Sequence, residues 1–167
     1  MRRGRVEDAP ALARYAAACF EAAFGSANDP ADMAAYVREA FGPAQQASEL
    51  ADPAFATFLA EIGPALAGYA QLTAGRRDPA VAGARPIELK RFYVGAEWHG
   101  RGVAQALMAA VLAEARRLGA DVVWLCVWEH NPRARAFYRK AGFDDAGTAP
   151  FQLGRDLQTD IVMTRSV

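Results

Sequence analysis

Cysteine and histidine are scarce in this sequence of 167 residues, which has two of each. Cys19 lies in an alanine-rich stretch and Cys126 in the apolar run VVWLCVW, so both are expected to be buried, unpaired thiols of a reducing compartment. This excludes a secreted fold held together by disulfides. His99 and His130 have no further ligands at metal spacing around them, and we expect no metal site.

The sequence also lacks a net charge, a long apolar run and a recognisable leader. Its 19 basic residues balance 19 acidic ones and the calculated pI is about 6.7, so no general attraction to nucleic acid is expected. No uncharged apolar stretch reaches the roughly 18 residues of a membrane span, and MRRGRVEDAP has no apolar core behind it, so we expect no signal peptide. With 53% hydrophobic and 23% charged residues, the sequence predicts a soluble, cytoplasmic protein with one domain, residues 1–167.

The first half of the chain predicts two main helices and a hairpin. After a short leading strand, Asp8 is placed to cap a helix that reaches about residue 24. Either Asn28 or Asp29 is placed to cap a second helix that ends near residue 41, and a short helix follows to about residue 50. Gly63 and Pro64 separate two apolar runs and predict a hairpin.

The second half alternates strands with helices. A strand at 87–94 precedes a helix at about 101–118, whose expected buried stripe is Val103, Leu107, Val111, Ala115 and Leu118. The run at 122–128 is apolar on both alternating faces, as in a central strand covered on each side. Asn131 before Pro132 predicts the start of a helix that ends near 141, and two strands complete the chain. The order predicts a mixed α/β protein built on one sheet.

Small residues gather at the junction between the strand at 87–94 and the helix that follows. Gly100, Gly102 and Ala104 alternate there, with Arg101 between the glycines. Free N–H groups and the dipole at a helix start bind anions, and Arg101 adds a cation. A tight turn without a ligand would use the same glycines. A dinucleotide-binding fold would place such a loop in its first βαβ unit and an acidic residue at the end of the second strand, and neither condition is met here.

The segments YVGAEWHGRGVAQAL and VWEHNPRARAFYRKAGF resemble the cofactor motifs of the GNAT superfamily of acyl-CoA N-acyltransferases. In the family pattern Gln/Arg-x-x-Gly-x-Gly/Ala, His99 stands where Gln or Arg is usual, Gly102 matches the glycine and Ala104 the small residue. The second motif is matched by Asn131, Ala134, Tyr138, Gly142 and Phe143. The resemblance implies an α/β fold with a mostly antiparallel sheet of six to seven strands, splayed at its centre and flanked by about four helices.

By this resemblance the cosubstrate is acetyl-CoA, and no metal is needed. The backbone of Phe92, Tyr93 and Val94 would bind the pantetheine arm, and an N–H group near Val94 would polarise the thioester oxygen. Asn131 would bond the pantetheine in addition to capping its helix. The residues implied around the pyrophosphate are His99, Gly100, Arg101, Gly102, Val103 and Ala104.

Tyr138 is the general acid that the resemblance implies, with its hydroxyl directed at the coenzyme sulfur. The alternative is a tyrosine that packs in the core beside Phe137. Glu88 is the candidate base, because alternation sends it to the face opposite its apolar neighbours and a buried carboxylate is costly unless used or paired. An ordinary salt bridge is the competing interpretation, and Glu129 and His130 are alternative bases.

The acceptor side is less defined by the sequence. Trp98 either covers the cofactor or packs, and Trp124 and Trp128 are expected to fill the core. A set of aromatic and acidic residues can line an acceptor groove or form a solvated helix face: Phe24, Asp29, Asp32, Tyr36, Glu39 and Phe41.

The resemblance implies an N-acetyltransferase that moves the acetyl group of acetyl-CoA to a primary amine by direct attack. The first half of the chain is similar to the branch that acetylates polyamines, so a small-molecule amine such as a polyamine is the expected acceptor. The alternatives are acetylation of a protein or peptide N-terminus, and a coenzyme A-binding regulatory module without turnover. No nucleic acid or membrane partner is expected, and exposed strand edges together with family habit make a homodimer the expected assembly.

Overall fold

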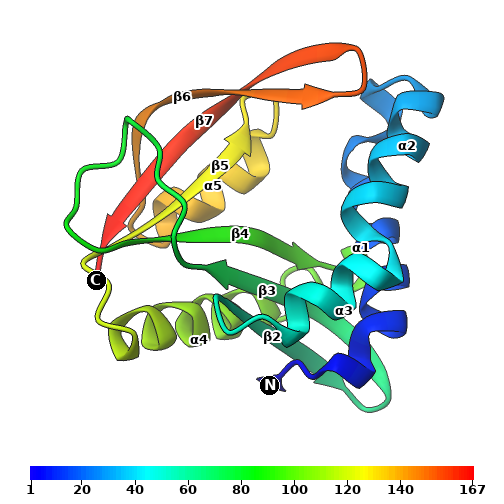
Figure 1. Ribbon diagram of the computed structural model, residues 1–167, viewed down its shortest axis with the longest axis horizontal. Coiled ribbons are helices and arrows are strands. Elements are labelled where there is room, and N and C mark those ends of the chain that lie inside the picture. Colours follow the sequence, from blue (N-terminus) through cyan, green and yellow to red (C-terminus); the bar gives the residue numbers. More distant parts are fainter.

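A computed structural model describes residues 1–167 as a seven-stranded sheet with helices on both faces (Figure 1). Its strands are β1 (Arg2–Arg3), β2 (Phe55–Ile62), β3 (Ala65–Thr73), β4 (Pro86–Val94), β5 (Val122–Trp128), β6 (Asp144–Leu153) and β7 (Asp156–Ser166). Their order across the sheet is β1-β2-β3-β4-β5-β7-β6, and every neighbouring pair is antiparallel except β4 and β5. The expected mixed α/β, mostly antiparallel sheet is confirmed.

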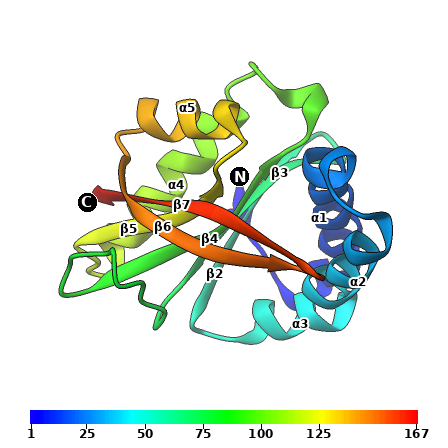
Figure 2. The same cartoon turned by 90° about the horizontal axis from the view of Figure 1, so that it is seen from above.

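The helices form two layers, one on each face of this sheet (Figure 2). The α-helices are α1 (Ala9–Phe24), α2 (Pro30–Phe41), α3 (Pro43–Ala51), α4 (Val103–Arg117) and α5 (Pro132–Lys140). Short 3-10 turns are η1 (Val6–Asp8), η2 (Gly25–Ala27) and η3 (Ala96–Trp98). Helices α4 and α5 cover one face, and α1, α2 and α3 lie over the other. None of these helices is both long and apolar enough to span a lipid bilayer.

Each layer has its own apolar core. The larger cluster packs α4 against the strands, with Leu107 and Val111 fully buried, and the smaller one packs α1 and α2 around Leu12 and Phe20. The predicted stripe of α4 is correct for its first four members. Leu118 is 47% exposed, because it is the C-cap of α4 and lies beyond the part of the helix that covers the sheet.

Side-chain caps mark where α2 and α5 begin, whereas α1 begins without one. Asp29 caps α2 by accepting from the N–H groups of Ala31 and Asp32, and Asn131 caps α5, as predicted. Asp8 occupies the N-cap position of α1 but does not cap it with its side chain. Its carboxylate instead accepts two hydrogen bonds of 2.7 Å from the guanidinium of Arg2, a stronger charged partner than a backbone N–H group.

Strands β4 and β5 pair only at their beginning and then diverge. Their register runs from Pro86 opposite Val122 to Glu88 opposite Trp124, and no pairing continues beyond it. Just after this point β4 has a bulge at Lys90, since Arg91 lies opposite Gln71 while Leu89 lies opposite the next residue of β3. A bulge bends its strand and increases the local twist. The edge of β4 from residue 89 to residue 94 therefore has no strand beside it on the β5 side.

Candidate active site

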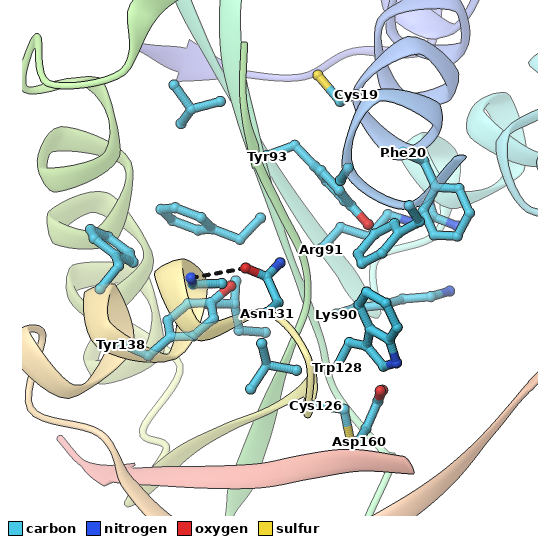
Figure 3. Close-up of a pocket in the computed structure, with 18 of the residues that line it drawn as sticks. Cys19, Phe20, Lys90, Arg91, Tyr93, Cys126, Trp128, Asn131, Tyr138 and Asp160 are labelled. Carbon is cyan, nitrogen blue, oxygen red and sulfur yellow. Dashed lines mark hydrogen bonds between the residues drawn. The ribbon is translucent and has the colours of Figure 1, made fainter. Parts of the chain in front are cut away.

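A cavity of about 1060 Å³ occupies the gap between the diverging strands β4 and β5 (Figure 3). Residues from both layers of the molecule line it. The η3 turn, the start of α4 and one face of α5 contribute on one side. Elements α1, α2, β6 and β7 contribute on the other. Two molecules that enter from opposite faces of the sheet can therefore meet between β4 and β5.

The loop between β4 and α4 presents backbone N–H groups to the first side. Gly100 and Gly102 have φ angles of +73° and +82°, a region that favours glycine, and a Cβ atom on either would meet nothing within 4 Å. Gly102 is the N-cap of α4, and no side chain caps that helix. Uncapped N–H groups at a helix start beside open space fit an anionic group such as a phosphate. Ala104 also lines the cavity, whereas Arg101 and Val103 do not.

His99 connects this loop to the end of β4 through its side chain. Its ring lies 3.0 Å from the carbonyl oxygen of Val94, and Arg133 of α5 contacts its Nδ1 atom at 2.9 Å. Both His99 and Arg133 line the cavity, and Arg133 was missed by the sequence analysis. Arg101 stands over the ring of Trp98, with its guanidinium carbon 5.5 Å from the ring centroid. Trp98 lines the cavity as well, packed against the larger core.

Helix α5 brings two predicted residues to the gap. The Oδ1 atom of Asn131 accepts a hydrogen bond of 3.1 Å from the N–H group of Ala134 (Figure 3). Tyr138 is buried against Phe92 and Phe143, at ring centroid distances of 6.1 and 5.9 Å. Its hydroxyl has no hydrogen-bond partner in the protein, and burial raises its pKa. Tyr138 is thus both a core residue and a protonated donor at the cavity wall.

The last residues of β4 form the floor of the cavity. Phe92, Tyr93 and Val94 all line it, with side chains that alternate between the two layers. Phe92 packs on Phe137 at 5.4 Å, whereas Tyr93 stacks on Tyr69 at 5.6 Å. The free edge of β4 in this stretch can accept an extended, amide-bearing chain in the way that a sheet edge accepts a strand.

Glu88 lies at the closed end of the gap, where β4 and β5 still pair. It is 5% exposed and accepts hydrogen bonds of 3.0 and 3.2 Å from Arg76, which belongs to the loop between β3 and β4. Burial raises its pKa, against the lowering effect of Arg76 and Lys90. The salt bridge weighed from the sequence therefore exists, but Arg76 is the partner, because Lys90 and Arg91 both pair with Glu49 of α3.

The second side of the cavity is mostly aromatic. Its rings include Tyr15, Phe20, Phe24, Tyr36, Phe41, Tyr93, Trp124, Trp128 and Phe151. Of the predicted groove residues, Phe24, Tyr36 and Phe41 are part of it, but the acids Asp29, Asp32 and Glu39 are not. Asp29 caps α2 instead, and Asp32 accepts from the N–H group of Arg155.

Two expectations for β5 are corrected by this side of the cavity, and a third is confirmed. Cys126 is exposed rather than buried, and Trp128 is only partly buried, because β4 has diverged from β5 at this point and leaves them facing the cavity. Trp124 is buried, as expected of a core residue, but it too contributes to the wall. The alternative bases Glu129 and His130 lie outside the cavity lining.

Asp160 of β7 is a second cavity residue that the sequence analysis missed. It lies opposite Trp128 in the antiparallel β5–β7 pair and lines the aromatic side of the cavity (Figure 3). Burial, together with the charge of Glu129, raises its pKa to about 6. An aspartate among the apolar residues of TDIVM was the available sequence signal, but only the pairing with Trp128 brings it to this cavity.

Comparisons with known proteins agree with this geometry. Residues 11–143 match the profile of the Acetyltransferase (GNAT) family. An uncharacterised N-acetyltransferase of Mycobacterium tuberculosis (strain ATCC 25618 / H37Rv) is 39% identical over 160 residues, which cover 96% of this chain and 98% of the relative. Another, from Lactobacillus delbrueckii subsp. lactis, is 27% identical over 161 residues, covering 96% of this chain and 93% of its own.

The fold also matches solved structures. The PaiA N-acetyltransferase from Thermoplasma acidophilum in complex with coenzyme A superposes with a TM-score of 0.81 at 18% identity, covering 99% of this chain and 97% of that one. A GCN5-related N-acetyltransferase from Kribbella flavida gives a TM-score of 0.71 at 24% identity, covering 99% and 96%. With the profile match over most of its length, the chain belongs to the GNAT family of acetyltransferases and is an acyl-CoA-dependent N-acyltransferase.

Proposed function

We propose that the protein transfers the acetyl group of acetyl-CoA to the primary amine of a small molecule, with polyamines as the first class to test. The observation that carries this proposal is the cavity between β4 and β5, which residues of both layers line. One side offers a place for an anionic, amide-bearing cosubstrate, and the other is lined by aromatic rings and a carboxylate that suit a cationic amine. The Tyr138 hydroxyl faces the gap between them.

The cofactor side has a role for each predicted residue that lines it. The N–H groups that follow Gly100 and Gly102 at the start of α4 would hold the pyrophosphate, with His99 fixing the loop to Val94. The free edge of β4 at Phe92–Val94 would bond the amides of the pantetheine arm, and its N–H groups would polarise the thioester oxygen. Asn131 would add a bond to the same arm. Arg101 does not line the cavity, so it would bind only those groups of the coenzyme that extend beyond the cavity.

The reaction forms a bond between the amine nitrogen and the acetyl carbon and breaks the bond between that carbon and sulfur. An alkyl ammonium with a pKa of about 10.4 is neutral in only about one molecule per thousand at pH 7. Glu88 is the proposed base, because burial raises its pKa toward the working range and its carboxylate lines the cavity. The leaving thiolate, whose parent thiol has a pKa of about 8.5, would take the proton of the Tyr138 hydroxyl, and the second proton that the nitrogen loses as the amide forms would restore that hydroxyl.

The test is the release of coenzyme A thiol from acetyl-CoA with a panel of acceptors, namely spermidine, spermine, aminoglycosides, free amino acids and short peptides. Tyr138→Phe should lower kcat about 100-fold or more while coenzyme A affinity changes little. Tyr69→Phe is the matched control, since the Tyr69 hydroxyl is buried outside the cavity without a partner. Turnover of small amines supports the proposal, and turnover of peptides alone replaces it with N-terminal acetylation.

Tight coenzyme A binding without turnover of any acceptor would identify a regulatory module instead. We also propose a cytoplasmic location, because the thiols of Cys19 and Cys126 are unpaired. Homodimer formation stays a prediction that light scattering can test.

A further inference from the structure

Asp160 differs from the other charged groups that are at least partly buried in the cavity wall. Glu88 is paired with Arg76, Lys90 and Arg91 are paired with Glu49, and Asp78 accepts from the N–H group of Ala80. The carboxylate of Asp160 has neither a hydrogen-bond donor nor an ion-pair partner, although the residue is partly buried. A carboxylate in this setting is expected to be matched by a positive charge, and the chain supplies none.

The surroundings of Asp160 favour a cation rather than a neutral donor. Trp128 lies directly across the β5–β7 pair, and its ring is 5.9 Å from that of Phe24. Tyr36 and Phe151, 5.5 Å apart, line the same side of the cavity. Aromatic faces attract ammonium groups, and a nearby carboxylate adds a full opposite charge. Glu129, the other acid that acts on Asp160, increases the negative potential there.

Asp160 is separated from the reacting centre by a strand. The free edge of β4 and the Tyr138 hydroxyl define the place of bond formation, whereas Asp160 projects from β7, on the far side of β5 in the sheet order. A group held by Asp160 is therefore distinct from the nitrogen that attacks the thioester. The aromatic side of the cavity connects the two positions.

We infer that Asp160, with the rings of Trp128 and its neighbours, binds a second ammonium group of the acceptor, so that the enzyme selects amines with two positive charges over amines with one. This inference rests on the proposed function and specifies its substrate class as linear diamines and polyamines. Asp160 is then a specificity-determining residue that does not take part in bond formation. Its partner charge is missing from the chain because the substrate supplies it.

The experiment compares amines that differ only in the second charge. Cadaverine is paired with pentylamine, which has the same five-carbon chain and a hydrogen atom in place of one amino group. For the wild-type enzyme we expect kcat/KM to be about 10–100 times higher with cadaverine, the range of one charged hydrogen bond. Asp160→Asn should remove this preference by raising KM for cadaverine, while the values for pentylamine stay within about twofold.

Two further variants test whether the change in substrate preference comes only from a disturbed structure. Asp144→Asn, which changes an exposed aspartate of β6 without a side-chain partner, should keep the wild-type preference. Asp160→Glu retains the charge and should restore part of the preference for cadaverine. A variant that has lost its fold would lose both substrates together, which thermal melts would also detect.

The outcomes separate this inference from the proposed function. Equal use of the two amines by the wild-type enzyme, or an equal loss of both in Asp160→Asn, overturns the role of Asp160 and leaves the acetyltransferase proposal standing. If no amine is acetylated, calorimetric titration of cadaverine into the coenzyme A complex tests whether Asp160 binds the diamine. Binding that Asp160→Asn abolishes keeps the role of Asp160, and the absence of cadaverine binding to the wild type overturns it.

Discussion

Glu88 and Asp160 lie on the same face of the sheet, at two positions along one cavity, and only one of them has a partner in the protein. The face is shared because Glu88 lies beside Trp124 of β5, and Asp160 lies opposite Trp128 four residues further along that strand. Glu88 is bonded to Arg76, whereas Asp160 is unpaired. This difference is the basis for the two roles that we propose, proton transfer for Glu88 and recognition of a cation for Asp160.

Replacement of Glu88 by Gln should slow the reaction most where the amine is protonated. We expect kcat/KM to fall about 100-fold near pH 7, the contribution of a positioned base. The loss should shrink as the pH approaches the pKa of the amine, because a neutral amine needs no base. The pH–rate profiles of both proteins, measured from pH 6 to pH 10, check this. A loss that stays the same at every pH would indicate that Glu88 only maintains the structure with Arg76.

Asp160→Asn should stabilise the protein while it impairs selection of the acceptor. The pKa of Asp160 is about 6 in the folded state and about 3.9 in an unfolded chain, so the folded state loses stability as the pH rises between these values. Removal of the carboxylate should therefore raise the free energy of unfolding at pH 8, by on the order of 1–3 kcal/mol. At pH 3 the gain should vanish. Urea unfolding at the two pH values measures it, and destabilisation at pH 8 would contradict a binding role.

The preference for a diamine over a monoamine should depend on pH through Asp160. Below about pH 6 its carboxyl is protonated and attracts a second ammonium group less, so the ratio of the two kcat/KM values should fall. Titration of the reacting nitrogen changes both kcat/KM values in the same way, so it does not change their ratio. The other titratable groups that act on this site are Tyr36 of α2, Cys126 of β5 and Glu129 at the end of β5. Asp160→Asn should show a ratio that is independent of pH over this range.

Gly102→Ala should weaken coenzyme A binding more than it weakens the fold. Its φ angle of +82° strains any other residue by roughly 1–2 kcal/mol, and the new Cβ atom would project into open space at the start of α4. Gly63→Ala is the matched control, because Gly63 in the β2–β3 hairpin has a φ angle of +58° and is equally open. Both variants should lose similar stability in thermal melts. Calorimetry should show reduced coenzyme A affinity for Gly102→Ala alone.

Glu49→Gln should be the most destabilising of these changes. Glu49 is 3% exposed and is the counter-ion of both Lys90 and Arg91. Burial raises its pKa, but the two cations outweigh this effect and hold the pKa below its usual value. Glu49 and its two cations contribute stability that is present above the pKa that Glu49 has in the unfolded chain. This stability is lost as the pH falls through the pKa that Glu49 has in the folded state.

We therefore expect a loss of about 3–5 kcal/mol near pH 7, because the buried Arg91 and the partly buried Lys90 lose their partner. The difference in the free energy of unfolding between Glu49→Gln and the wild type should become smaller as the pH falls. Glu39→Gln, at an exposed position of α2, is the control and should have an unfolding midpoint in urea close to that of the wild type. A change for Glu49→Gln as small as that of the control would contradict the role of this cluster.

Much of the fold and of the cofactor side could be predicted from local sequence. Pro after Asp29 and after Asn131 identified two helix starts, because capping depends on a few adjacent residues. The glycines at 100 and 102 indicated a tight turn or an anion site at a helix start for the same reason, and both have positive φ angles in the structure. Tyr138 follows Asn131 at a fixed spacing on one helix, so a single motif specifies both.

Residue partnerships between distant segments could not be predicted in this way. Glu88 pairs with Arg76 rather than with its neighbours Lys90 or Arg91, because the bulge in β4 and the position of Glu49 direct those cations elsewhere. Cys126 and Trp128 face a cavity because β4 leaves β5 at that point. The sequence of β5 alone shows only an apolar strand.

By itself, the sequence determined the order of the elements, the caps of α2 and α5 and the cofactor motif, since each depends on neighbours along the chain. Only the tertiary structure decided which carboxylates reach the cavity. Asp29 caps α2 and Asp32 accepts a hydrogen bond from the loop at Arg155, so neither reaches the cavity. Asp160 does reach it, because β7 pairs with β5 and places Asp160 opposite Trp128. The acceptor side is assembled from α1, α2, β6 and β7, and register across strands rather than spacing along the chain brings its residues together.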